Sequence, residues 1–105
     1  MCYVSKENMG EAIYNMKDCL LGCENGIKYR PDHLKGFFTR NDIESFRTRV
    51  DEALRIYFEI VRVNSNYPET ANSLSYEIEI NGHPLSRVAN ILKAMADTPQ
   101  KEYMA

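Results

Sequence analysis

Five side chains of this sequence could act as nucleophiles or as nitrogen and sulfur metal ligands, and these are Cys2, Cys19, Cys23, His33 and His83. Cys19 and Cys23 lie four residues apart on an expected helix, so their side chains share one face but run parallel, which is poor geometry for a disulfide. A structural zinc site usually takes two close pairs of ligands, and the sequence has no second close pair. We therefore expect two small buried hydrophobic side chains, with no metal and no cofactor.

Catalysis would require these groups to meet in space, and nothing in the sequence predicts that they do. A Cys–His pair would have to form between Cys19 or Cys23 and one of two histidines that lie in separate proline-bearing turns. Glycine-rich phosphate loops, the H-E-x-x-H zinc motif and the G-x-S-x-G nucleophile turn are all missing from the sequence. We expect no catalytic residues and predict that the protein is not an enzyme.

The segment from Lys28 to Arg40, KYRPDHLKGFFTR, is the best candidate for a binding site. It holds four of the chain's thirteen Lys and Arg residues but one of its fifteen acids, Asp32, in a sequence whose net charge is −2. Cations interleaved with aromatic rings suit a phosphate-bearing ligand, since the charges neutralise phosphate and the rings stack on bases. The candidate binding residues are Lys28, Arg30, His33, Lys35 and Arg40.

A structural role for the same segment stays open. Leu34, Phe37 and Phe38 could be core residues of a connector between two helices, with the charged side chains pointing outward around them. A third interpretation is that the segment is a binding site for an acidic protein surface. The residue types do not separate these alternatives.

Two long amphipathic helices are expected on either side of this segment. The first runs from Ser5 to about Cys23, with Gly26 as its stop, because apolar residues recur at steps of three and four. The second begins at Asn41, with Glu44 completing a capping box. Its opposite face carries alternating charges, a pattern typical of a solvated surface laced with ion pairs: Arg47, Asp51, Arg55, Glu59 and Arg62. Residues 57–63 either end this helix or form a strand, because they are rich in β-branched and aromatic types.

A strand over residues 74–80 is predicted by strict alternation of apolar and polar residues, with Glu77 and Glu79 on its outward face. Because one strand is not stable alone, it needs partners, from residues 2–5, from residues 26–30 or from a second copy. After it, either Pro84 starts a helix at once or a short hairpin strand comes first. The last helix runs to about Ala96, with Leu85 or Val88, then Leu92 and Met95, facing the core.

The fold class expected is α+β and mostly α: two long amphipathic helices plus a C-terminal helix, with a small antiparallel sheet built around strand 74–80. At 105 residues and 12.2 kDa there is room for one domain, which we place at residues 1–98, with residues 99–105 as a frayed tail. The sequence shows no apolar run of membrane-spanning length and no secretory signal, so we expect no membrane partner and a cytoplasmic location.

The function expected is that of a small non-catalytic interaction protein, forming a homodimer or higher homo-oligomer, that blocks or scaffolds a macromolecular partner. Small chains commonly complete their cores by self-association. Accessory proteins of phages and mobile elements are often of this size and equally poor in motifs, so the chain could be an accessory protein of this kind. The alternative is a nucleotide- or nucleic-acid-binding module that uses the basic and aromatic segment 28–40.

Overall fold

The computed structural model describes residues 3–29, 37–98 and 100–101, the last two by their backbone alone. Within these ranges the chain is mostly helical, as predicted. Its elements are α1 (Met9–Tyr29), β1 (Phe38–Thr39), α2 (Arg40–Asn66), the 3-10 turn η2 (Pro68–Thr70), α3 (Ala71–Asn81), α4 (Pro84–Asp97) and β2 (Gln100–Lys101). None of the helices in the described ranges is long and apolar enough to cross a bilayer.

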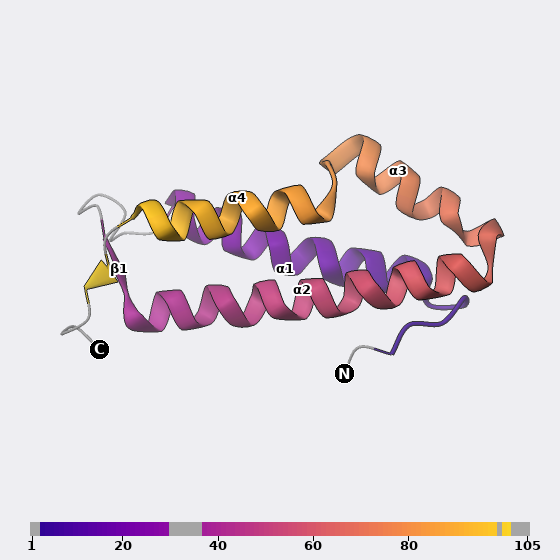
Figure 1. The fold of residues 1–105 in the computed structure, drawn as a ribbon, viewed down its shortest axis with the longest axis horizontal. Helices are drawn as coiled ribbons and strands as arrows, with labels where there is room; N and C mark the ends of the chain where they lie inside the picture. The colour runs from indigo at the N-terminus through magenta and orange to yellow at the C-terminus, as the bar shows by residue number, and fades with distance from the viewer. Residues whose placement is uncertain (1–2, 30–36, 99, 102–105) are drawn as a thin grey trace.

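The helices form an elongated bundle of three rods, the third of which is broken in two. α1 and α2 run lengthwise in opposite directions, α4 returns in the direction of α1, and α3 diverges from the other helices at one end (Figure 1). The molecule measures 49 × 26 × 18 Å, and its radius of gyration is 15.4 Å. A compact domain of this length would have a radius of about 13 Å. The bundle is therefore long and only about two helices thick.

α1 starts at Met9, later than the predicted Ser5, and extends past the predicted end near Cys23 to Tyr29. It buries Met9, Ile13, Met16, Leu20 and Cys23, the spacing that predicted it. Gly26 does not end the helix, and the predicted stop was wrong. A Cβ at Gly26 would lie 2.7 Å from the Phe46 ring, so the residue is needed for close contact between α1 and α2.

α2 is capped two residues earlier than predicted, by different side chains. Thr39 is the N-cap: its Oγ1 accepts a hydrogen bond from the Asp42 N–H at 3.2 Å, while Asp42 Oδ2 accepts from the Thr39 N–H at 2.9 Å. This is a reciprocal capping box, so the assignment to Asn41 and Glu44 was wrong. The helix continues to Asn66, so residues 57–63 are helical and form no strand.

The predicted antiparallel sheet around strand 74–80 is wrong, because these residues lie in helix α3. Leu74 is buried as the alternation predicted, but Tyr76 and Ile80 are exposed to solvent. Glu77, which was expected to point outward, is buried. The other strand candidates are not strands either: residues 3–5 pair with nothing as a ladder, and residues 26–29 belong to α1. Without a neighbouring strand, a helix is the one way for this segment to satisfy its backbone internally.

α4 starts at Pro84, so the helix alternative was correct and the hairpin was not. Gly82 separates α3 from α4 with φ 88° and ψ 165°, a backbone conformation open essentially to glycine alone. The buried residues of α4 are Pro84, Val88, Ile91 and Met95. Leu85 and Leu92 are 41% and 43% exposed, so the prediction that Leu92 faces the core was wrong.

The only pairing between extended residues in the described chain joins β1 to β2. It is parallel, with Phe38 opposite Gln100 and Thr39 opposite Lys101. Of the predicted tail 99–105, these two residues are the ones that the structure describes. The pairing holds the end of α4 near the start of α2.

Gly26→Ala tests the close contact of α1 with α2. Alanine favours a helix by about 1 kcal/mol over glycine, but the added Cβ would displace the buried Phe46 ring. We expect a net loss of about 1–3 kcal/mol in the free energy of unfolding, measured by urea denaturation. The matched control is Gly10→Ala, where nothing lies within 4 Å of the new atom. Equal stability of the two variants would contradict the contact.

Candidate interaction surface

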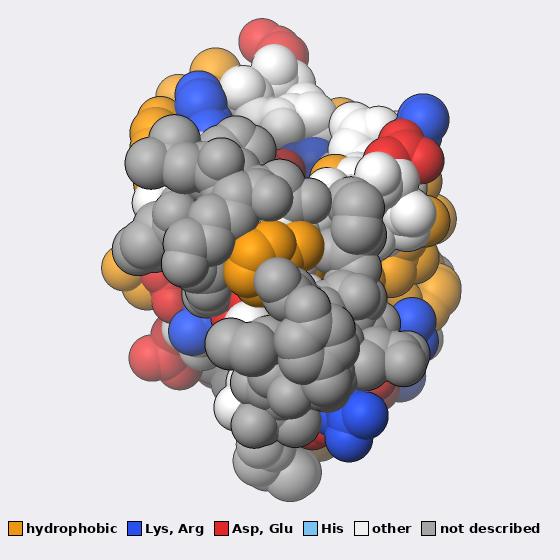
Figure 2. All heavy atoms as spheres, turned by 90° about the vertical axis from the view of Figure 1, so that its left-hand side faces the viewer, with side chains coloured by type: hydrophobic (Ala, Val, Ile, Leu, Met, Phe, Trp, Pro, Cys, Tyr) orange, Lys and Arg blue, Asp and Glu red, His pale blue; other side chains and the backbone are white. Residues whose placement is uncertain are grey.

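The basic segment predicted as a binding site falls mostly outside the described residues: Arg30, His33 and Lys35 lie within residues 30–36. Lys28 and Arg40 are described, and both are exposed, at the end of α1 and at the start of α2. The Lys28 ammonium lies 5.2 Å from the ring centroid of Tyr29. Figure 2 looks onto this end of the molecule, where the described Lys and Arg side chains in view lie apart at the edges. A phosphate site here stays a prediction.

One aromatic residue of that segment, Phe38, has a structural role. Phe38 is buried and meets the Phe46 ring edge to face, with 5.4 Å between centroids. This confirms the expectation that Phe38 anchors the connector. Leu34 lies outside the described residues, and Phe37 is half-buried.

Two of the groups considered for catalysis, Cys23 and His83, are engaged in structural contacts, while Cys2 and His33 lie outside the described residues. The Cys23 thiol donates to the Phe46 carbonyl oxygen at 3.5 Å, and burial raises the pKa of that thiol to about 11. His83 caps α4: its Nδ1 accepts from the Leu85 N–H at 3.1 Å, while Nε2 lies 3.4 Å from the Tyr57 hydroxyl. Because Nδ1 accepts a hydrogen bond, the ring hydrogen lies on Nε2, and this N–H donates a hydrogen bond to the Tyr57 hydroxyl oxygen. Within the described residues, no three His, Cys, Asp or Glu side chains are arranged to hold a metal ion.

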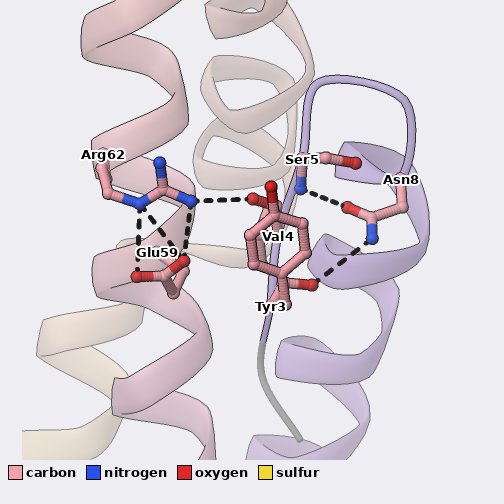
Figure 3. A network of polar contacts seen from close by, with 6 residues as sticks. All are labelled: Tyr3, Val4, Ser5, Asn8, Glu59 and Arg62. Atoms are coloured by element: carbon pink, nitrogen blue, oxygen red, sulfur yellow. Dashed lines mark hydrogen bonds and ion pairs between the residues drawn. The ribbon is translucent and has the colours of Figure 1, made fainter.

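A polar network ties the N-terminal segment to α2. Its Glu59–Arg62 ion pair was expected from the alternating charges of α2, but its contact with the N-terminal segment was not. Arg62 donates from Nη2 to the Val4 carbonyl oxygen at 2.9 Å and pairs with Glu59 at 2.8 Å (Figure 3). On the other side of the segment, Asn8 Oδ1 accepts from the Ser5 N–H at 2.7 Å. Val4 is thereby held in the core beside the start of α1.

Beside this segment lies a hollow of about 320 Å³ between α1 and α2, lined by Tyr3, Val4, Asn8, Glu11, Ala12, Asn15, Asp18, Cys19, Glu52 and Ile56. Three of the lining side chains are carboxylates, so the hollow would favour a cationic group over an anion. An acidic lining is common on solvated helix surfaces, and it identifies no ligand by itself.

The two sides of the third rod differ sharply in chemistry. On the side of α1, ion pairs join the helices: Arg87 holds Glu24 with two hydrogen bonds of 2.7 and 3.1 Å, and Lys17 Nζ lies 3.6 Å from Glu77 Oε1. The Arg87 side chain is 13% exposed, so this bidentate pair is partly shielded from water. Charge therefore fixes α3 and α4 onto α1.

On the side of α2, the surface is apolar and open. A row at steps of four, three and four runs along α4: Leu85, Ala89, Leu92 and Ala96, all of them exposed. The neighbouring flank of α2 carries half-buried Ile43 and Leu54 and exposed Phe58 and Val61. We call these eight residues, with Arg47 and Asp51 between them, the α2–α4 face. It is the strongest candidate for a functional surface.

Sequence reasoning missed this face because it assigned Leu92 to the core. The available signal was that α4 has more apolar residues than one buried stripe needs. Val88, Ile91 and Met95 form that stripe, and Leu85 and Leu92 lie beside it.

Comparisons with known proteins identify no relative. None of the protein-family models matches the chain, and no curated protein and no solved structure matches it significantly. The function of the chain is therefore inferred from the described residues alone.

Glu24→Gln tests whether the partly shielded pair with Arg87 fixes α4 to α1. Removing the carboxylate charge weakens two charge-assisted hydrogen bonds, and we expect a loss of about 1–2 kcal/mol in unfolding free energy. Asp97→Asn is the control, because its pair with Lys93 is exposed, at 75% and 64%, and such pairs contribute at most about 1 kcal/mol. Equal effects in urea denaturation would contradict the assignment.

Cys23 is expected to resist alkylation in the folded chain. Its pKa is raised from 9.0 to about 11 by burial, which lowers the thiolate fraction near neutral pH about a hundredfold. Because the folded pKa is the higher one, this thiol also favours folding below pH 9, and that contribution is lost as pH rises toward 11. Iodoacetamide labelling followed by peptide mass spectrometry measures the rate. A rate within about tenfold of the unfolded chain's would contradict the burial.

Proposed function

We propose that this chain is a non-catalytic interaction protein that binds a macromolecular partner through the α2–α4 face. The observation that carries the proposal is the row of exposed leucine and alanine residues on α4, which lies level with half-buried Ile43 and Leu54 of α2, while exposed Phe58 and Val61 continue the apolar flank of α2 beyond the start of α4. Scattered apolar residues on a surface need no explanation, but a continuous row across two adjacent helices is typical of an interface.

The geometry of the face also indicates what kind of surface it accepts. The alternating large and small apolar residues of α4, beside the flank of antiparallel α2, leave a ridged surface on which another helix can pack, as in a four-helix bundle. The partner surface is then helical and apolar. Binding would act by covering that surface in the partner, which blocks it, or by holding two partners together.

Catalysis is not part of the proposal, because two of the described groups that could supply it serve the fold. Cys23 is buried with a raised pKa, and His83 caps α4. The hollow beside Tyr3 offers carboxylates without a shielded acid–base pair.

Leu92→Glu is the variant that tests the proposal. It places a charge in the middle of the face, whereas Leu21→Glu changes a leucine of nearly equal exposure, 45% against 43%, on α1. With the tagged full-length chain expressed in its own cells, we expect a co-purifying partner, an untagged copy of the chain included, to be retained by Leu21→Glu. With Leu92→Glu we expect recovery at least about tenfold lower, since a buried unpaired charge costs more than 1.4 kcal/mol.

The outcome that contradicts the proposal is equal recovery of every partner with the two variants. Both substitutions are at exposed helix positions, and circular dichroism checks that each variant is as helical as the wild type. A difference in recovery then reports the surface and not the fold.

A further inference from the structure

The α2–α4 face contains two rows of residues, one on each helix, that are each symmetric about nearly the same level of the bundle. Tyr57 of α2 lies beside His83 at the start of α4, and Phe38 lies beside Gln100 beyond its end. The two helices are antiparallel, so moving forward along α4 from His83 corresponds to moving backward along α2 from Tyr57 by the same number of residues. Ala89, six residues after His83, is therefore level with Asp51, six residues before Tyr57.

The row on α4 is self-complementary in size. Leu85, Ala89, Leu92 and Ala96 are symmetric about the point midway between Asn90 and Ile91. If the same row packs against it in the opposite direction about that point, Leu85 faces Ala96 of the second copy and Leu92 faces its Ala89. Each large side chain then meets a small one, which is the pattern that lets helix ridges fill grooves.

The row on α2 is self-complementary in charge and hydrophobicity about the same level. Ile43, Arg47, Asp51 and Leu54 are symmetric about residues 48 and 49, and in the reversed row Arg47 faces Asp51 while Ile43 faces Leu54. The level of α2 that matches the symmetry point of α4 is residue 49 or 50. One axis therefore serves both helices.

Arg47 and Asp51 are two exposed charges on α2 that form no ion pair within the described residues. Arg55 pairs with Glu52 at 3.4 Å and Arg62 pairs with Glu59 at 2.8 Å. Arg47 and Asp51 are exposed, and no hydrogen bond or ion pair joins either of them to another residue in the described ranges. A foreign partner would need a matching pair of opposite charges at this spacing, whereas a second copy supplies it automatically.

We infer that the occupant of the α2–α4 face is a second copy of this chain, related by a two-fold axis perpendicular to the helices at the level of Arg49. This inference rests on the proposed function and names its partner. α2 packs antiparallel to α2 of the second copy, and α4 packs antiparallel to its α4. Two Arg47–Asp51 ion pairs flank the axis on the α2 side, and the leucine and alanine rows interlock on the α4 side.

A charge exchange within one chain tests the symmetry. Arg47→Asp places two acids opposite each other at both symmetry-related contacts, and Asp51→Arg does the same with two bases. At low salt we expect each single variant to raise the dimer dissociation constant at least about tenfold. The double variant Arg47→Asp/Asp51→Arg restores opposite charges across the axis, so its dissociation constant should return to within about threefold of the wild type.

Sedimentation equilibrium of the purified full-length chain gives these constants, with the wild type expected at twice 12.2 kDa. Single variants as tight as the wild type, or a double variant no tighter than the singles, would overturn the two-fold arrangement. A wild type that stays monomeric at millimolar concentration would overturn self-association altogether. In that case the proposed function is still judged separately by the loss of a different partner with Leu92→Glu.

Discussion

The close contact of α1 with α2 is the constraint on which the rest of this fold depends. Gly26 leaves room for the Phe46 ring, Phe46 meets Phe38, and the Cys23 thiol bonds to the Phe46 carbonyl oxygen. Because these contacts bring the two helices together at the end where α2 begins, they position the two helices against which α4 packs. Leu20 and Ile60, both fully buried, continue the contact along the bundle.

The two flanks of α4 differ in chemistry. The flank toward α1 is occupied by charge, since Arg87 holds Glu24 and Lys17 lies near Glu77. The flank toward α2 has leucine and alanine and no ion pair to close it among the described residues. Ion pairs set orientation better than they add stability, so the charged flank fixes the rotation of α4, and that rotation directs Leu85 and Leu92 outward. The exposure of Leu85 and Leu92 is in this sense a consequence of the Glu24–Arg87 pair.

Helix positions were predictable wherever the apolar residues recur at helical spacing, as at Met16, Leu20 and Cys23. The segment around Tyr76 was not, because strict alternation over seven residues fits a strand locally, and the absence of a neighbouring strand is a property of the whole chain. Leu92 was assigned to the core for a related reason: spacing shows which residues share a face, but not how a helix is rotated when it carries two apolar faces. The basic segment 28–40 was found from composition alone, and its middle lies outside the described residues.

The symmetry of the face is the central claim, and intermolecular nuclear Overhauser effects test it most directly. In a mixed sample of isotope-labelled and unlabelled chains, filtered spectra record only contacts between copies. The account predicts cross-peaks between the methyl groups of Leu92 and Ala89 and between those of Leu85 and Ala96. Intermolecular cross-peaks that instead involve Tyr14 and Leu21 on α1, or no intermolecular cross-peaks at concentrations where dimer is present, would contradict it.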